Sequence, residues 1–305
     1  MADRVGSMIE RTFTLRLPLD MRLTLGPLRR GRNDPCMRID ASEALRATRT
    51  PDGPATIHLR SRASEVSAKA WGPGAAWALD NAPELLGADD DPRGFTPEHP
   101  ALEDLHRNHP GLRIGRSSNV VEVLIPTILE QKVTGKEARR SYERIVRRHG
   151  DPAPGPGGLW VPPTPAYLAS LPSWTWHELG VERRRTETIR LACSYAGRLE
   201  ETVTMSFESA HKRLTSLPGI GDWTAAHTTM AALGHADAVM VGDFHLPHLV
   251  AWVLARETRG SDERMLELLE PYRGQRGRVI RLIDAAGDRP ARVAPRRALR
   301  AIERI

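Results

Sequence analysis

The sequence predicts an α+β protein in which a small antiparallel sheet domain precedes a mostly α-helical body. Up to about residue 95, short apolar segments with partial alternation are separated by Pro, Gly and Asp, as in strands joined by turns. Beyond that point the apolar residues recur with helical spacing, and no segment repeats at a fixed period. We therefore expect an α+β domain at 1–95 and a helical domain of two subdomains at 96–305.

Cap and turn signals place the individual elements. Asn119 followed by Glu122 marks a helix start, and Thr134 with Glu137 forms a capping box. Pro126 lies inside the first of these helices, where we expect a kink. Strands are expected at 13–17, 56–59 and 66–70, helices at 75–86, 101–108, 165–171, 175–179, 184–199, 207–216, 222–233, 244–257, 261–270 and after 275, and loops at 89–100 and 151–165.

Composition excludes several classes of protein. The chain has 305 residues, of which 40% are hydrophobic and 27% charged, as in ordinary globular proteins. Its net charge of +6 is compatible with an anionic partner such as nucleic acid. Cys36 and Cys193 are its two cysteines, which excludes a disulfide framework, a four-thiolate zinc site and a four-cysteine iron–sulfur cluster.

The sequence gives no sign of secretion or membrane insertion. The first 20 residues carry charges where a signal peptide has its apolar core. No apolar run approaches the roughly 20 residues that a bilayer requires. We therefore expect a cytoplasmic protein.

The stretch LPGIG at 217–221 joins two expected helices. Gly219 and Gly221 allow a tight reversal with Ile220 between the helices, and they leave the N–H groups at the start of the second helix accessible to a phosphate. The alternative is a simple turn between helices, the more common use of a lone GxG. A dinucleotide fingerprint is excluded, because no strand precedes the turn and Thr224 replaces the third glycine.

The residue spacing around this turn resembles that of a known protein family. LPGIGDWTA is followed by an isolated acid, Asp243, 22 residues after Gly221. This pattern resembles the helix–hairpin–helix (HhH-GPD) DNA glycosylases of base-excision repair, and it is most similar to bacterial 3-methyladenine-DNA glycosylase II. The segments at 99–138, 161–171, 178–196 and 269–274 also resemble that family. The resemblance implies a helix–hairpin–helix at 207–233.

The resemblance implies that Asp243 is the catalytic residue of a monofunctional glycosylase. Cleaving a base from deoxyribose builds positive charge on the sugar, which a nearby carboxylate stabilises while it activates water. Related lyases carry a Lys at the position of Trp223, and an indole cannot form an imine. The alternative for Asp243 is a helix N-cap, and both roles can hold at once.

The same resemblance suggests a base pocket formed by Trp223, His227, Phe244 and Arg281. Aromatic rings stack on an extruded base, but Trp223 could instead belong to the hairpin core, and His227 could also be structural. Relatives carry Tyr at the position of His227 and Trp at the position that matches Arg281. These departures remove stacking faces worth about 1–3 kcal/mol each.

The expected DNA contacts come from two segments. They comprise Gly219, Ile220, Gly221 and Thr224 of the hairpin, with Gln131 and Lys132. Relatives carry an apolar wedge where this chain has Lys132, which could bind phosphate instead. The negative charge of Asp222 interacts favourably with the dipole at the start of its helix, but it would repel phosphate unless the side chain points sideways.

No metal or other cofactor is expected, apart from a monovalent cation at the hairpin carbonyls, which the resemblance implies. His245 and His248 lie three residues apart but lack a third ligand, so surface or core roles are favoured over a metal site. The expected partner is double-stranded DNA containing damaged bases, bound by a monomer at the nucleoid and without a membrane.

Three functions stay open at this point. The first is a glycosylase for damaged, alkylated purines. The second is a glycosylase-like protein that binds damage without cleavage. The third is a glycosylase for a deaminated or oxidised base, with Arg281 and His227 supplying hydrogen bonds.

Overall fold

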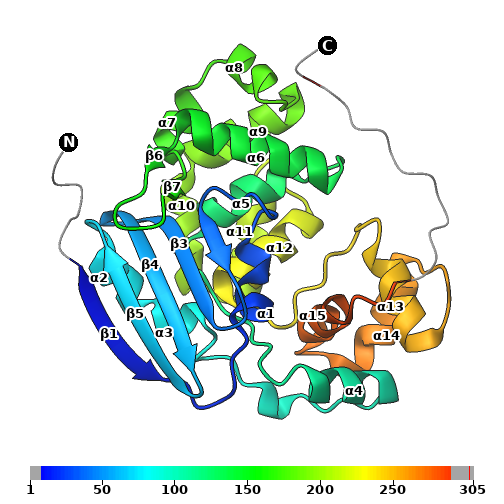
Figure 1. Cartoon of the computed structure of the whole chain (residues 1–305). Helices are drawn as coiled ribbons and strands as arrows, with labels where there is room; N and C mark the ends of the chain where they lie inside the picture. The colour runs from blue at the N-terminus through cyan, green and yellow to red at the C-terminus, as the bar shows by residue number, and fades with distance from the viewer. Residues whose placement is uncertain (1–7, 290–301, 303–305) are drawn as a thin grey trace.

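An antiparallel sheet of five strands forms the N-terminal part of the computed structural model, which describes residues 8–289 and residue 302 (Figure 1). The strand order is β1-β5-β4-β3-β2. The strands are β1 (Ile9–Thr14), β2 (Met37–Ile39), β3 (Glu43–Thr50), β4 (Gly53–Arg62) and β5 (Glu65–Trp71). With the helical body that follows, this sheet confirms the α+β prediction.

Alternation in β4 sets the core face of the sheet. Ala55, Ile57 and Leu59 are buried, and Leu59 lies opposite Ala68 of β5 in the register. Helices α2 (Ala75–Asp80) and α3 (Ala82–Leu85) pack against the same core. In β4 and β5, alternate side chains thus face the core, as the period of two requires.

Strands β2 and β3 were not predicted from the sequence. In β3, the buried positions Arg46 and Thr48 are polar, so the apolar alternation that marks a strand is missing. Both side chains donate to Glu122 of helix α5 (Val120–Leu129), at 2.6 Å from Arg46 and 2.8 Å from Thr48. The strand is therefore stabilised by a polar contact with a distant segment, which local patterning does not reveal.

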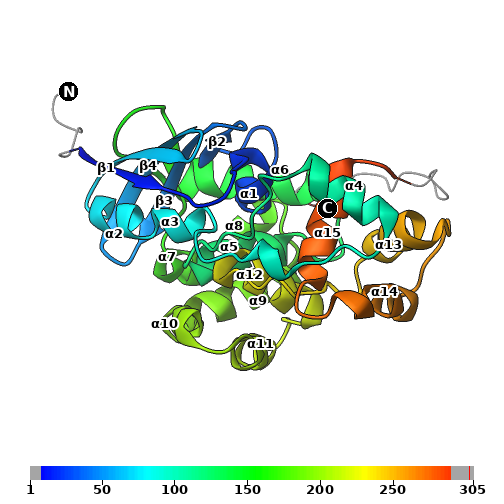
Figure 2. The ribbon, with the colours of Figure 1, turned by 90° about the horizontal axis from the view of Figure 1, so that it is seen from below.

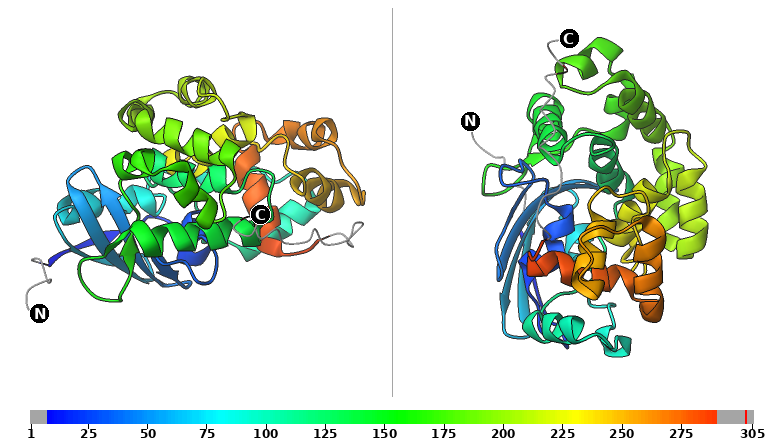
Figure 3. Two further views of the ribbon diagram at one scale, coloured as in Figure 1. Left: turned by 90° about the horizontal axis from the view of Figure 1, so that it is seen from above. Right: turned by 90° about the vertical axis from the view of Figure 1, so that its right-hand side faces the viewer.

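A short helical segment links β1 to β2 and lies between the sheet and the helical body (Figure 3). It consists of α1 (Met21–Leu25) and the 3-10 turn η1 (Gly26–Leu28). Asp20 caps α1 by accepting from the N–H of Leu23 at 2.9 Å. Met21 and Leu25 are buried in the sheet core, which leaves the opposite side of α1 directed to the helical body.

The helical body has two apolar cores on either side of helix α12 (Asp222–Leu233). Ala225 and Ala232 contribute to one core, whereas Ala226 and Met230 contribute to the other. The small side chains of α12 allow helices to approach it on both sides.

The first core contains helices α5, α6 (Gly135–His149), α7 (Pro165–Ser170), α8 (Ser173–Glu178), α9 (Arg183–Ser194), α10 (Ala196–Glu200) and α11 (Phe207–Thr215). The second contains α4 (Pro100–Asn108), α13 (Leu246–Ala255), α14 (Asp262–Leu269) and α15 (Arg276–Ala286). Figure 2 shows these two groups at opposite ends of the body. The minor elements are β6 (Asp151–Pro152), β7 (Trp160–Val161), η2 (Pro92–Gly94), η3 (Glu201–Thr204) and η4 (Glu270–Tyr272).

The cap signals in the sequence are confirmed. The Asn119 side chain accepts from the N–H of Glu122, and Thr134 and Glu137 form the reciprocal capping box. Helix α5 runs on through Pro126 to Leu129. Hydrogen bonds cross the expected domain boundary at residue 95, for example that from the Ile114 N–H to Asp90. The boundary itself stays a prediction. No helix among residues 8–289 is long and apolar enough to cross a membrane.

Replacing Glu122 by Ala should lower the free energy of unfolding by about 3 kcal/mol, because it leaves Arg46 buried without its partner carboxylate. Only 13% of the Glu122 side chain and 7% of that of Arg46 are exposed. Urea unfolding provides the measurement. Glu143→Ala is the matched control, because Glu143 pairs with Arg147 on the surface of α6. Its loss should stay within about 0.5 kcal/mol, and an equal loss in both variants would contradict the assignment.

Candidate active site

The hairpin between α11 and α12 has the geometry that its glycines predict. Gly219 has a φ of +91°, and a Cβ at this position would lie 2.2 Å from Oγ1 of Thr188. Ile220 is buried in the first core, whereas nothing lies within 4 Å of a Cβ built on Gly221. The first N–H groups of α12 follow Gly221 and have no acceptor within the helix. The turn therefore offers backbone donors of the kind that bind phosphate.

Gln131 and Lys132 lie beside the hairpin. The Gln131 side-chain amide donates to the Gly219 carbonyl at 3.0 Å and to Oγ1 of Thr224 at 2.9 Å. Thr224 is buried, so it positions Gln131 rather than facing solvent. Lys132 is exposed and has a φ of +56° in the turn between α5 and α6. Arg185 stabilises the end of α5, just before this turn, by donating to the Leu129 carbonyl at 2.6 Å.

Asp222 is paired across the hairpin. Its carboxylate lies 3.3 Å from Nε2 of His211 on α11. The Asp222 side chain therefore points across the hairpin toward α11. The monovalent cation at the hairpin stays a prediction. Carbonyl oxygens suit such an ion, and those of Leu217 and Gly219 each keep a lone pair beyond the hydrogen bond that they accept.

The carboxylate of Asp243 is fixed by three hydrogen bonds. The indole N–H of Trp223 donates to Oδ2 at 2.9 Å, and the backbone N–H groups of His245 and Leu246 donate to Oδ1 at 2.7 and 2.9 Å. The backbone donors are His245, the N-cap of α13, and Leu246, its first residue, so Asp243 binds N–H groups at the start of that helix without being its N-cap residue. Gly242, with a φ of +86°, turns the chain just before it. Both roles of Asp243, an acceptor for the start of α13 and a site carboxylate, are compatible with this geometry.

These contacts keep Asp243 ionised. Burial alone would raise the pKa of its carboxyl, but the donors from Trp223, His245 and Leu246 outweigh burial and hold the pKa below its ordinary value. The carboxylate is thus a permanent negative charge at neutral pH.

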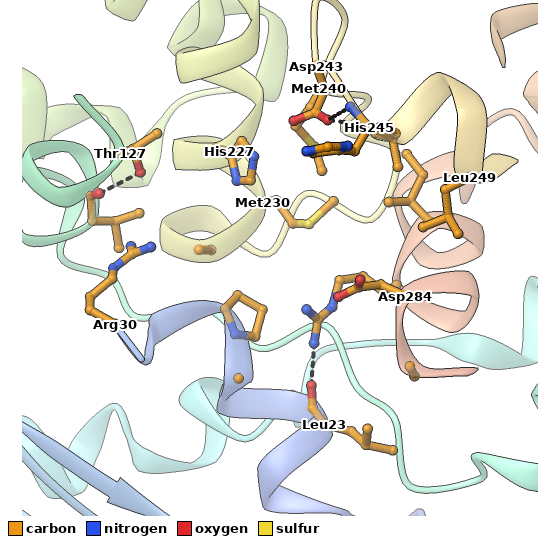
Figure 4. Close-up of a pocket in the computed structure, with 18 of the residues that line it drawn as sticks. Leu23, Arg30, Thr127, His227, Met230, Met240, Asp243, His245, Leu249 and Asp284 are labelled. Atoms are coloured by element: carbon orange, nitrogen blue, oxygen red, sulfur yellow. Dashed lines mark hydrogen bonds between the residues drawn. The ribbon is translucent and has the colours of Figure 1, made fainter. Parts of the chain in front are cut away.

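Asp243 lies at a cavity of about 450 Å³, within the range of ligand pockets. Figure 4 shows Asp243 and His227 on one side and Arg30 and Leu23 on the other. Residues of α1 and the turn after it line one part of the cavity. The rest of the lining comes from α5, α12, α15, the chain around Asp243 and the start of α13. Arg281 of α15 joins this lining and donates to the Leu23 carbonyl, shown by a dashed line in Figure 4.

His227 is uncharged at neutral pH. Burial in the cavity wall, together with the positive charges of Arg30 and Arg281, lowers the pKa of its imidazole to about 4. The neighbouring Asp243 acts in the opposite direction but does not offset these effects. Burial likewise lowers the pKa of Arg281, to about 10, so this guanidinium stays charged. The cavity therefore presents a neutral imidazole beside a cation.

The four predicted pocket residues are not all in the cavity. His227 and Arg281 line it, but Trp223 does not, since its ring lies against His227 with centroids 4.5 Å apart and its N–H faces Asp243. Phe244 also lies outside the lining, with 72% of its surface exposed and its ring edge-on to His245. Asp243 turns inward while the next side chain turns outward, so adjacency in sequence does not place Phe244 in the cavity.

Sequence reasoning missed the contribution of the N-terminal domain. Arg22, Leu23, Pro27 and Arg30 close one side of the cavity. Their signal is weak, because the Arg-rich run at 28–32 resembles many solvated basic stretches. His248 accepts from the Gly260 N–H at 3.1 Å, a structural contact. Residues 8–289 contain no cluster of three His, Cys, Asp or Glu side chains suited to a metal.

Comparison with known proteins supports the resemblance seen in the sequence. Escherichia coli DNA-3-methyladenine glycosylase 2 is 30% identical over 166 residues, which cover 54% of this chain and 59% of that protein. Over about half of its length the chain is similar to DNA-3-methyladenine glycosylases. It spans 34% to 61% of the length of the curated relatives that it matches. No protein-family profile matches the sequence.

Solved structures of DNA glycosylases share the fold. The 3-methyladenine DNA glycosylase from Archaeoglobus fulgidus has a TM-score of 0.74 at 20% identity, and the match covers 90% of this chain and 97% of that one. MBOgg1, solved in complex with a low-affinity DNA ligand, has a TM-score of 0.70 at 13% identity, with 92% and 96% covered. Both matches extend across the sheet and the helical body.

Trp223→Phe should raise the pKa of the Asp243 carboxyl, because the variant removes a donor that lowers it. The rise should be about one unit, as expected for the loss of one hydrogen bond to a charged group, and titration of the carboxyl by NMR provides the measurement. Trp252→Phe is the matched control, because the Trp252 N–H donates to Asp288 instead. Unchanged titration of Asp243 in both variants would contradict the positioning role.

Stability should decrease as the pH falls from about 6.5 toward 4, because unfolded His227 takes up a proton that the folded protein excludes. The free energy of unfolding should fall by about 2 kcal/mol. This is less than the pKa shift of His227 alone would give, because the cavity is open to solvent. His227→Gln should flatten this part of the curve in urea unfolding. A wild-type imidazole that titrates near its ordinary pKa of 6.5 by NMR would refute the account.

Proposed function

We propose that this protein is a monofunctional DNA N-glycosylase that releases damaged purine bases by hydrolysis. The observation that carries this proposal is the carboxylate of Asp243, ionised and fixed by three donors at a cavity of ligand size. The relation to DNA-3-methyladenine glycosylases gives alkylated purines as the first substrate class to test. Double-stranded DNA is the partner, and base-excision repair is the process in which such a reaction takes part.

The hairpin would hold the DNA backbone beside the target nucleotide. The N–H groups at the start of α12 face open space at Gly221, where a phosphate can approach without meeting a side chain. Gln131 and Lys132 lie next to this turn, and Gln131 is tied to it by two hydrogen bonds. The exposed Lys132 adds positive charge to the same surface. Together these groups would bind the strand next to the extruded nucleotide.

The extruded base would enter the cavity and bring its sugar to Asp243. As the glycosidic bond lengthens, its electrons leave with the base and C1′ of the sugar becomes cationic. The fixed negative charge of Asp243 stabilises this cation without reorganising, and the carboxylate then accepts a proton from the attacking water. A cationic alkylated base leaves as a neutral molecule, whereas a neutral base leaves as an anion that takes up the proton lost by the water. The products are the free base and an abasic site in an intact strand.

Trp223 accounts for the expected lack of strand cleavage. A lyase needs an amine that attacks C1′ and forms an imine, and the residue that follows Asp222 in the hairpin helix carries an indole instead. In this chain the indole N–H orients the carboxylate. Trp223 would therefore support hydrolysis by orienting the carboxylate of Asp243.

Asp243→Asn should reduce base release by about 100-fold or more while the affinity for lesion duplexes stays within about threefold of the wild type. The amide keeps the shape of the side chain but loses its charge. A labelled duplex with one lesion is incubated with enzyme and then treated with hot alkali, which cuts at abasic sites. Wild-type enzyme should give no cut without alkali and no product trapped by borohydride. Full activity in Asp243→Asn would refute the proposal.

A further inference from the structure

The cavity presents little aromatic surface to a base. Among the described residues that line it, the rings are the imidazoles of His227 and His245, and the remainder is largely aliphatic, methionine and charged side chains. Phe244 is outside the lining, and Trp223 faces Asp243. A cationic base gains most from the faces of electron-rich rings such as Trp and Tyr. This cavity lacks that means of holding a positive charge.

Positive groups dominate the lining. The charged residues that line the cavity are Arg22, Arg30, Arg281, Arg289, Asp243 and Asp284. Asp284 pairs with Arg289 at 2.8 Å, and Asp243 is directed to the sugar in the proposed function. Arg30 has a weak partner, since its guanidinium lies 3.8 Å from Glu130. Arg22, Arg30 and Arg281 line the space that a base would occupy, and the charge of Asp284 lies near that of Arg281.

Arg281 and His227 offer hydrogen bonds of a defined kind. A guanidinium carries several N–H donors and no acceptor, and Arg281 uses one donor on the Leu23 carbonyl. Arg281 and Arg30 lie close enough to His227 to depress its protonation. The neutral imidazole can donate or accept. A carbonyl oxygen on the base would therefore meet donors, whereas an exocyclic amino group would face a guanidinium that cannot accept from it.

We propose that this cavity selects neutral damaged bases that present carbonyl oxygens, the class that deamination of purines produces, over permanently cationic alkylated bases. The inference rests on the proposed function, because it assumes that an extruded base enters this cavity. Hypoxanthine is the simplest member, since it is adenine with its amino group replaced by a carbonyl. Guanine also has a carbonyl, but its pairing with cytosine makes its extrusion more costly than that of a mispaired base.

The test compares the affinities of one duplex carrying hypoxanthine, 7-methylguanine or undamaged adenine at a single position. A 2′-fluoro sugar at that position disfavours the cationic transition state, so binding is measured without cleavage. Wild-type protein should bind the hypoxanthine duplex about tenfold more tightly than the 7-methylguanine duplex, because 7-methylguanine has the same carbonyl but carries a positive charge that the guanidiniums repel. Equal affinity, or tighter binding of 7-methylguanine, would overturn the inference.

Two variants link the preference to the lining. Arg281→Gln and Arg30→Gln each remove one positive charge from a different element, so that failure of one to fold leaves the other informative. Each should reduce the preference for hypoxanthine by about threefold or more. Arg11→Gln is the matched control, since Arg11 pairs with Asp80 outside the cavity. A preference that both lining variants leave intact would show that these guanidiniums do not select the base.

Base release from the same duplexes with ordinary sugars separates the two claims. Release that depends on Asp243 but is faster for 7-methylguanine, together with tighter binding of that duplex, would support the glycosylase and overturn the selectivity. A hypoxanthine preference in binding without release of any base would support the selectivity and overturn the glycosylase. Preferred binding and release of hypoxanthine would support both.

Discussion

The hydrogen bonds to the carboxylate of Asp243 connect the parts of this structure that the proposed reaction needs. The indole of Trp223 comes from the second helix of the hairpin, and the backbone donors of His245 and Leu246 come from the start of α13. A partly buried charge is costly unless it is hydrogen-bonded, so this arrangement offsets the cost at that position. It also fixes the carboxylate relative to the turn that would hold the DNA strand. Positioning and electrostatics thus depend on the same few contacts.

The N-terminal sheet domain matters because it completes the cavity. Helix α1 and the turn after it supply Leu23 and Arg30, opposite His227 and Asp243 (Figure 4). The same domain is connected to α5 through Glu122, whose carboxylate accepts from Arg46 and Thr48 of β3. The cavity is thus lined by two regions that lie far apart in the sequence.

Local chemistry made much of the helical body predictable from the sequence. The caps at Asn119 and Thr134 depend on neighbouring residues, and both form as expected. Strand β3 was not predicted, because its inward side chains are paired with a distant carboxylate rather than with apolar neighbours. The hairpin and the spacing of Asp243 indicated the site, but side-chain direction was not available, so Phe244 was expected in a pocket that it does not line. Arg30 could not be assigned, because only tertiary packing brings it to His227.

The most direct test of the central claim is the affinity for a duplex that carries a positively charged sugar mimic. A pyrrolidine ring in place of the target nucleotide is cationic near the position of C1′, whereas a tetrahydrofuran ring has a similar shape and no charge. If Asp243 stabilises the developing cation, the wild type should bind the pyrrolidine duplex about 100-fold more tightly than the tetrahydrofuran duplex, and Asp243→Asn should lose most of that difference. Equal binding of the two duplexes by the wild type, or an undiminished preference in Asp243→Asn, would contradict the account.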